Sequence, residues 1–526
     1  MGYVEGTNRE QVVLFPAVID DYIRTENPVR FVEAFVQGLD LGALGFSKAE
    51  PEERGRPAYD PRDLLKLYIY GYVNEIRSSR KLERETIRNV EVMWLLRRLT
   101  PDHKTIANFR KDNVLVLPGV FREFTKLCRE LQLFGAELVG IDGSKFRAGN
   151  SRDRNFNEGK LKQRLQWIEA RIAAYLTALQ RADEGDRESS EMGAAELQAK
   201  IAALQEKQLV YEGLQAQLAE SDEKQISLTD GDARLMKGRQ GQHVSYNVQI
   251  AVDSKHKLVA DYAVTNEGND VNCLAALAQG AQRELGVKEL KVCADRGYYN
   301  TTQIKTCEDA GIEVHMERPE PRQLKGIFPL ERFTYEALKD SYTCPAGKRL
   351  RYRTFDKEKQ VRCYWTEACH RCELKGQCTT GKGPRKIKRP LGQEAAERML
   401  QRVAANREWL ALRKQLVEHP FGTMKRQMGH DYFLMRGQEK VSGETSLTLL
   451  AYNLKRVMKL QGVAKLIAAL AKQNRENALA ITGLALFDWK RRLLPRLNGR
   501  KSRALSFARR LTLPVRMPAL HSLRVS

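Results

Sequence analysis

The sequence predicts an α/β fold, in which a mixed sheet is interrupted by insertions and preceded by an all-helical region. In residues 243–252, HVSYNVQIAV, apolar and polar residues alternate at period two, as in a half-buried strand. The turn DSKHK follows, and LVADYAVT forms the returning strand of a β-hairpin. The chain then reads helix, strand, helix, strand, with ELKVCADRG and GIEVHME as the strands. ELVGIDGSKFR, residues 137–147, adds a short buried strand. Strands that alternate with helices are typical of an α/β core.

Residues 1–130 are predicted to form helices. Asp60 and Pro61 mark a helix start, because Asp caps a helix and Pro suits its first turn. Apolar residues follow at helical spacing in LLKLYIYGYVNEI, and TPDHKTIANFRKDN leads into a basic helix. Basic side chains among these helices could contact the phosphates of a DNA backbone: Arg77, Arg80, Lys81, Arg84, Lys104 and Arg110. The alternative is the solvated face of an ordinary helical bundle.

Two segments interrupt the predicted core, and a basic tail follows it. Residues 156–225 carry apolar positions three and four apart on either side of the polar turn ADEGDRESSEMG, which predicts an antiparallel helical hairpin. Such a hairpin could also serve as an arm through which two subunits form a dimer. Residues 319–394 are basic and rich in cysteine, and helices resume in residues 395–475. Residues 476–526 hold many basic and few acidic side chains.

The composition favours a polyanionic partner. The 526 residues include 89 Lys and Arg against 66 Asp and Glu, a net charge of +23, and nucleic acid is the first candidate for so basic a chain. The alternative is that the charge only keeps the protein soluble. No stretch of ~18 apolar residues predicts a membrane span, and the early acids of MGYVEGTNRE argue against a secretory signal. We therefore expect a cytoplasmic protein with reduced cysteines.

The cysteines of residues 319–394 predict a structural zinc site. CHRC has the two-residue spacing of a zinc knuckle, and four thiolates complete a tetrahedral site. The favoured ligands are Cys344, Cys369, Cys372 and Cys378. Cys363 and His370 are substitutes, and free cysteines in a reducing cell are the alternative. The remaining cysteines lie in apolar segments and are expected in the core: Cys128, Cys273, Cys293 and Cys307.

Two of the predicted strands end in an acid followed by a small turn, GIDGS at Asp142 and CADRGY at Asp295. If the strands are neighbours, the two carboxylates converge and repel each other unless a hard cation lies between them. Mg²⁺ or Mn²⁺ meets this need, and two such ions about 4 Å apart would stabilise the attacking and leaving oxygens of a phosphodiester. For each Asp taken alone, capping a turn explains its place in the sequence as well as binding a metal does.

A third acid is expected from a helix that faces this edge of the sheet. Glu418 lies in LVEHPFGTMKRQMGHDYFLMRGQEKV, and Lys425 follows on the same face if the helix is continuous. Pro420 and Gly422 make that continuity uncertain on the sequence alone. A carboxylate for the metal and a lysine for phosphate would suit strand transfer on DNA.

Three other acids compete for the metal. Asp230 and Asp232 lie in a Gly-containing loop. Asp270, with Asn269, is explained as a cap of the helix DVNCLAALAQGAQREL. These acids therefore rank below Asp142, Asp295 and Glu418.

Taken in order, these segments resemble the bacterial insertion-sequence transposases of the DDE class. AYDPRDLLKLYIYGYVNEIRSSRKLER with PDHKTIANFRK is similar to their N-terminal helical domain, which is thought to bind the element's ends. LVGIDGSKF, VCADRGYYN and VEHPFGTMKRQMGHDYFLMRGQEKV with LAYNLKRV resemble the motifs of the first Asp, the second Asp and the Glu. SLTDGDARLMKGRQGQHVSYNVQIAVD with VTNEGND resembles the strand block between them. The resemblance covers nearly the whole chain, with residues 319–394 as an insertion.

The resemblance implies an RNase H-like catalytic core, in residues 131–318 and 395–475, with Asp142, Asp295 and Glu418 as a metal-binding triad. Relatives often carry a Tyr and an Arg before the Glu, where this chain has Ala411 and Lys414. The side chains expected at DNA are Lys425, Arg426, Arg80, Lys104, Arg110 and Arg296, with Arg234 and Lys237 beside them.

The sequence therefore predicts a DNA transposase. It would bind double-stranded DNA at the element's inverted repeats, cleave there and transfer the 3′-hydroxyl ends to target DNA by divalent-metal phosphoryl transfer. A homodimer at the bacterial nucleoid would hold both ends. The alternatives are a catalytically inactive DNA-binding derivative and an RNase H-like nuclease. A serine or tyrosine recombinase is disfavoured, because no Arg cluster surrounds Ser144 or Tyr298.

Overall fold

The computed structural model describes residues 18–50, 57–183, 193–221, 223–238, 241–320 and 326–472. The chain divides into two compact units, Met1–Val463 and Ala464–Ser526, and the elements named below belong to the first. The predicted basic tail, residues 476–526, lies outside the described residues, as do residues 1–17 of the predicted helical domain.

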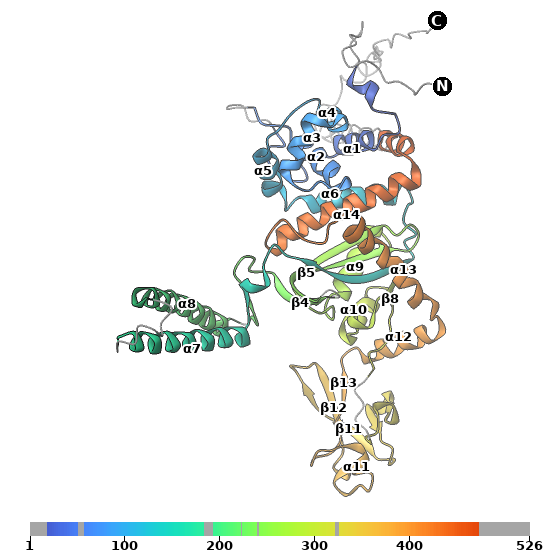
Figure 1. Cartoon of the computed structure of the whole chain (residues 1–526). Helices are drawn as coiled ribbons and strands as arrows, with labels where there is room; N and C mark the ends of the chain where they lie inside the picture. Colours follow the sequence, from blue (N-terminus) through green and yellow to red (C-terminus); the bar gives the residue numbers. More distant parts are fainter. Residues whose placement is uncertain are drawn as a thin grey trace, which may run out of the picture. The chain divides into compact units, whose positions relative to one another are not determined.

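Helices make up the N-terminal region, as the sequence predicts (Figure 1). At the start of one of them, the Asp60 side chain accepts a hydrogen bond from the Arg62 amide and Pro61 is the first helical residue. This cap satisfies an amide that the first turn leaves without a partner. The helices are α1 (Pro28–Gln37), α2 (Pro61–Val73), α3 (Ser79–Arg88), α4 (Val90–Leu95), α5 (His103–Asn113) and α6 (Leu117–Glu130).

A six-stranded mixed sheet follows, in the order β4-β5-β1-β7-β8, with β6 also paired to β5. Strand β1 (Leu138–Arg147) is antiparallel to β5 (Gly241–Asp253) and parallel to β7 (Leu290–Cys293). The remaining strands are β4 (Arg234–Gly238), β6 (Val259–Thr265) and β8 (Ile312–His315). The predicted hairpin is confirmed, because β5 and β6 pair in antiparallel register, and with it the α/β fold.

Helices cover both faces of this sheet. On one face, α13 (Glu408–Gly422) lies so close to β1 that a Cβ added to Gly140 would come within 3.1 Å of Val417. On the other face, Gly280 of α9 (Leu274–Leu285) lies against Asp261 of β6. Asp261 pairs with Ala251, which in turn pairs with Ile141, so these three residues share one face of the sheet. The Cβ position of Gly140, the residue before Ile141, points to the opposite face. The other core helices are α10 (Thr301–Asp309), α12 (Gln393–Ala405) and α14 (Gln438–Gln461).

The helix α14 also joins the core to the N-terminal helices. Its Glu444 is fully buried and accepts hydrogen bonds from the amides of Leu434 and Met435. Arg77, which precedes α3, lies 3.6 Å from this carboxylate and donates to the carbonyl of Tyr432. Since a buried charge requires a partner, this ion pair fixes the helical region against the sheet domain.

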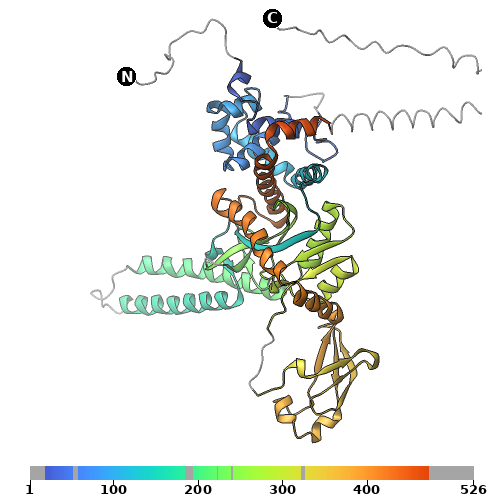
Figure 2. The same cartoon turned by 90° about the vertical axis from the view of Figure 1, so that its right-hand side faces the viewer.

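The first insertion is a pair of long helices, α7 (Glu158–Asp183) and α8 (Ala194–Glu220), which run side by side in Figures 1 and 2. At its base, β2 (Asn155–Phe156) pairs with β3 (Ile226–Ser227). A small apolar cluster closes that base: Phe156, Leu161, Leu214 and Leu218. The hairpin expected in residues 156–225 is thus present.

The cysteine-rich insertion has its own antiparallel sheet, in the order β13-β12-β11-β10-β9. Its strands are β9 (Thr334–Glu336), β10 (Ser341–Thr343), β11 (Arg349–Asp356), β12 (Val361–Trp365) and β13 (Ile387–Pro390), with the short helix α11 (Lys375–Cys378). In the described part of the insertion, five buried side chains form the core of this sheet: Phe333, Tyr342, Leu350, Tyr364 and Ile387. Partly buried side chains pack against them: Phe328, Leu330, Tyr335, Cys344 and Cys378. So small a core usually needs a further cross-link.

No helix in the described part of the chain is both long enough and apolar enough to cross a membrane.

Candidate active site

Asp142 and Asp295 lie at the same edge of the sheet. In the parallel pair, Gly140 of β1 is opposite Cys293, the last residue of β7. Each acid comes two residues later, so the two neighbouring strands bring them to the same region. Asp295 follows the end of β7, but Asp142 lies inside β1, which continues to Arg147, so the predicted end of that strand at Asp142 was wrong. Asp142 accepts a hydrogen bond from the Gly143 amide at 2.8 Å, and Asp295 accepts one from the Gly297 amide at 2.7 Å.

The carboxylates at this edge repel one another. Burial of the carboxyl raises the pKa of Asp142 to about 6, the Arg413 guanidinium opposes this rise, and the charges of Asp295 and Asp270 add to it. The buried hydroxyl of Tyr298 has its pKa raised by burial and by the same three carboxylates. Negative charge therefore converges here, which is the electrostatic setting that a hard cation relieves.

Asp270 is not a helix cap, and that interpretation was wrong. Helix α9 begins at Leu274, and its cap residue, Cys273, makes no side-chain capping bond. The Asp270 carboxylate instead accepts hydrogen bonds from the side-chain amides of Asn247 and Gln249, each at 2.6 Å, and lies 3.6 Å from the Lys145 ammonium. Local sequence carries no signal for this placement, because the partners come from β1 and β5.

The glycines of both acidic motifs make room for Asp270. A Cβ on Gly143 would lie 2.3 Å from the Gln249 amide nitrogen and 2.9 Å from Asp270 Oδ1. A Cβ on Gly297 would lie 2.9 Å from Asp295 Oδ1 and 3.9 Å from Asp270 Oδ2. Both motifs thus need glycine for close packing around the acids.

The other two competing acids hold a loop in place. Asp230 accepts hydrogen bonds from the Tyr246 hydroxyl at 2.7 Å and the Gly437 amide at 3.1 Å. Asp232 accepts one from the Gln438 amide at 2.8 Å. The bonds from the Gly437 and Gln438 amides anchor the start of α14, which favours a structural role for the two acids.

Helix α13 brings Glu418 and Arg413 to the same region. Leu416 and Val417 pack on Gly140, and Arg413 extends to Asp142, with 3.4 Å between Nη1 and Oδ2. Glu418 is exposed and, within the described part of the chain, its side chain makes no hydrogen bond or ion pair. The structure thus places its helix beside Asp142 but records no contact between Glu418 and either Asp.

Lys425 reaches the strand that carries Asp142. Pro420 lies inside α13, and the helix continues without a break into a π-helical turn, Thr423–Gln427. The Lys425 ammonium donates to the Ser144 hydroxyl at 2.7 Å and lies 4.3 Å from the centre of the Phe146 ring. Ser144 is therefore engaged, and Tyr298 is fully buried, so neither residue is placed as an exposed nucleophile.

The residues expected at DNA fall into two groups. Exposed side chains are found at Arg80, Lys104, Arg296, Arg426 and Lys237. Arg110 instead packs inward, with its guanidinium 5.6 Å from the centre of the Tyr68 ring, and Arg234 is paired with Glu223. Arg77 is only 8% exposed. The inward placement favours structural roles for Arg110 and Arg77.

The four favoured cysteines lie around one small cavity in the insertion. Cys344, Cys369, Cys372 and Cys378 all line it. The pKa of the Cys378 thiol is raised by burial first and then by the three neighbouring thiols. The substitutes lie elsewhere: Cys363 is buried in β12, and His370 is half-exposed beside Glu367. Cys128, Cys293 and Cys307 are buried as expected, whereas Cys273 is only partly so.

Among the residues that the structure describes, no three His, Cys, Asp or Glu side chains are placed so that they hold a metal ion as they stand. The donor chemistry nevertheless suits two different metals. Converging carboxylates at the sheet edge suit a hard ion such as Mg²⁺, and converging thiols suit Zn²⁺.

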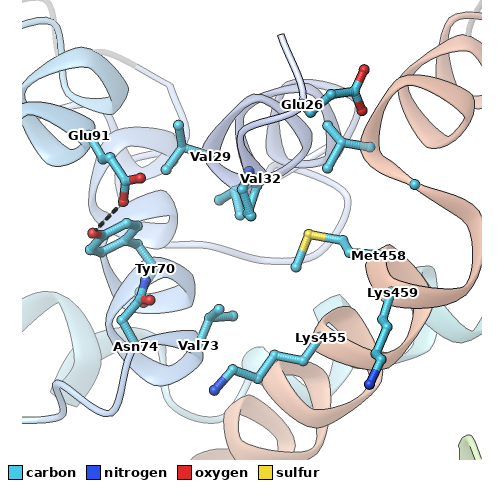
Figure 3. Close-up of a pocket in the computed structure, with 13 residues that line it drawn as sticks. Glu26, Val29, Val32, Tyr70, Val73, Asn74, Glu91, Lys455, Met458 and Lys459 are labelled. Carbon is cyan, nitrogen blue, oxygen red and sulfur yellow. Dashed lines mark hydrogen bonds between the residues drawn. The ribbon is translucent and has the colours of Figure 1, made fainter. Parts of the chain in front are cut away.

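A cavity of about 480 Å³ lies away from these acids (Figure 3). It is lined by apolar side chains of α1, α2 and α14, among them Val32, Val73 and Met458, with Lys455 and Lys459 at its side. Tyr70 donates to Glu91 at its wall, at 2.8 Å. None of the residues predicted for catalysis lines it.

Two stretches of the chain match known protein families. Residues 17–112 match the family described as Transposase domain (DUF772), which spans α1 to α5. Residues 343–458 match the family described as Transposase DDE domain, which includes the thiol cluster, Glu418 and most of α14. Asp142 and Asp295 lie outside both matches. No curated protein and no solved structure matches the chain.

Proposed function

Because the chain belongs to the DDE-type transposases of insertion sequences, we propose that it cleaves DNA at its element's ends and joins the freed 3′-hydroxyl ends to target DNA. The observation that carries this proposal is that Asp142 and Asp295 each lie two residues beyond the paired Gly140 and Cys293 of neighbouring parallel strands, with α13 packed beside β1. Paired carboxylates at such an edge are suited to phosphoryl transfer.

Asp142, Asp295 and Glu418 are the proposed ligands of Mg²⁺ or Mn²⁺. A bound divalent ion would activate the attacking oxygen and stabilise the leaving one. Burial, together with the neighbouring charges of Asp295 and Asp270, raises the pKa of Asp142, and this perturbed carboxyl supports the assignment. Lys425, beside Ser144 on β1, supplies a positive charge for a DNA phosphate. A homodimer would let two such sites act on the two ends of one element.

An excision assay in cells tests the proposal. The gene would be supplied beside its native flanking DNA as wild type and as Asp295→Ala, and the donor junction would be amplified. Excision by the wild type alone is expected. Excision that survives the substitution would refute the role of Asp295. Binding to the ends without excision by either protein would favour the inactive DNA-binding alternative, and cleaved but unjoined ends would favour a nuclease.

Exposed basic residues of the helical region are proposed to contact DNA phosphates. Arg80→Ala combined with Lys104→Ala is expected to flatten the salt dependence of binding, because each lost phosphate contact removes about 0.9 from the slope of log K against log salt. Titrations of labelled duplex at several salt concentrations measure this slope. The control is Lys207→Ala, an exposed lysine of α8. An unchanged slope in the double variant would exclude these two residues from the interface.

The proposal includes a structural zinc ion at Cys344, Cys369, Cys372 and Cys378. The thiols surround one cavity, and the sheet beside them has only a small core. Purified protein is expected to hold about one zinc per chain, and Cys372→Ser to lose it together with thermal stability. His370→Ala, a nearby donor outside the cluster, should keep the metal. Equal zinc contents in all three proteins, measured by mass spectrometry, would refute this assignment.

A further inference from the structure

The cation that faces Asp142 in the structure is an arginine. Arg413 Nη1 lies 3.4 Å from Asp142 Oδ2. Within the described part of the chain this is the only ion pair that Asp142 makes. The side chain of Arg413 is 13% exposed and that of Asp142 is 25% exposed, so solvent screens the pair only partly.

The position of Arg413 is fixed by its helix. Leu416 and Val417, about one turn further along α13, pack directly on Gly140, where the missing side chain allows close approach. Sequence patterns do not single out Arg413, because the relatives' motif carries its Arg at the position of Lys414. Lys414, however, is exposed, and it is Arg413 that turns toward the acids.

The guanidinium of Arg413 is incompletely satisfied. Its Nη1 is buried and has no hydrogen-bond partner, although it lies within ion-pair distance of Asp142. A buried donor without an acceptor is unfavourable and gains from any anionic oxygen that reaches it. The acceptor that the proposed reaction brings to this place is a phosphate oxygen of DNA.

We infer that Arg413 competes with the divalent metal ion for Asp142, so that metal loading is coupled to DNA binding. A guanidinium and a divalent cation at one carboxylate repel each other, and one must leave as the other arrives. When Arg413 turns to a DNA phosphate, Asp142 becomes free for the metal. Since such coupling is reciprocal, DNA raises the affinity for metal, and metal raises the affinity for DNA. This inference rests on the proposed metal site at Asp142.

The inference is tested by the affinity of the full-length protein for Mn²⁺, measured by electron paramagnetic resonance without DNA. Arg413→Gln is expected to bind Mn²⁺ on the order of tenfold more tightly than the wild type, because the competing cation is gone. Lys414→Gln, the exposed neighbour, should leave the affinity unchanged. Arg413→Lys, which keeps the charge, should stay near the wild type and shows that the site tolerates substitution.

A second measurement adds a duplex that carries the element's end. DNA should tighten Mn²⁺ binding to the wild type several-fold and have less effect on Arg413→Gln. Equal Mn²⁺ affinity of the wild type and Arg413→Gln would overturn the inference while leaving the metal site intact. Mn²⁺ binding that is insensitive to Asp142→Asn in every background would instead overturn the metal site, and the inference with it.

Discussion

Gly143→Ala is expected to reduce DNA cleavage on the order of 100-fold while the protein stays folded. The added methyl would lie 2.3 Å from the Gln249 amide nitrogen and 2.9 Å from Asp270 Oδ1. These groups must shift, and β1 moves Asp142 with them, since Asp142 precedes Gly143. A displacement of about 1 Å at a catalytic group costs about that factor. Cleavage rates on a labelled duplex, with circular dichroism to verify folding, measure the effect.

The matched control for this substitution is Gly231→Ala. No atom lies within 4 Å of a Cβ at Gly231, so the rate should stay at the wild-type value. If Gly143→Ala also cleaves at the wild-type rate, the close packing of Gln249 and Asp270 around the acidic edge does not support catalysis.

Gly443→Ala is expected to lower the free energy of unfolding by about 2–3 kcal/mol. Gly443 lies in α14, where an added Cβ would be 2.0 Å from the carbonyl oxygen of Val114 and 2.6 Å from its side chain. The clash is with backbone, which cannot rotate away, so α14 and the N-terminal helices must separate. Thermal unfolding followed by circular dichroism would show a lower Tm.

Gly213→Ala provides the comparison for Gly443. Gly213 lies in the long helix α8 with nothing within 4 Å of its Cβ position. Alanine favours a helix over glycine by about 0.5–1 kcal/mol, so this variant should be as stable as the wild type or more so. A stability loss at Gly213 as large as that at Gly443 would contradict the contact between α14 and Val114.

The elements that sequence patterns predicted are those with local causes. The hairpin of β5 and β6 follows from period-two alternation and a polar turn, and α2 begins where Asp60 and Pro61 place it. The acid and the glycine that interrupt each apolar run predicted the end of β7, but not that of β1, which continues past Asp142 to Arg147. The convergence of Asp142 and Asp295 then required only that the strands be neighbours.

The features that sequence patterns missed depend on contacts between distant segments. Asp270 has a plausible local role as a cap, but it follows β6, whose pairing with β5 places Asn247 and Gln249 within hydrogen-bond distance of it. Arg110 and Arg77 look like surface charges in sequence. In the structure, however, Arg110 packs against the Tyr68 ring and Arg77 pairs with the buried Glu444. Arg413 is selected by the packing of α13 on Gly140, which no local pattern encodes.

The most direct test of the proposed mechanism is metal-dependent cleavage by purified protein. A labelled duplex carrying the element's end would be incubated with Mg²⁺ and with the wild type, Asp142→Asn, Asp295→Asn or Glu418→Gln. Glu169→Gln, an exposed acid of α7, is the control. Each substitution of a proposed ligand should lower the cleavage rate more than about 100-fold. This exceeds the effect expected for residues that only hydrogen-bond to a metal's ligands. The control should keep full activity. Wild-type rates in Asp142→Asn or Asp295→Asn would contradict the account, and a wild-type rate in Glu418→Gln alone would transfer the third ligand to another acid.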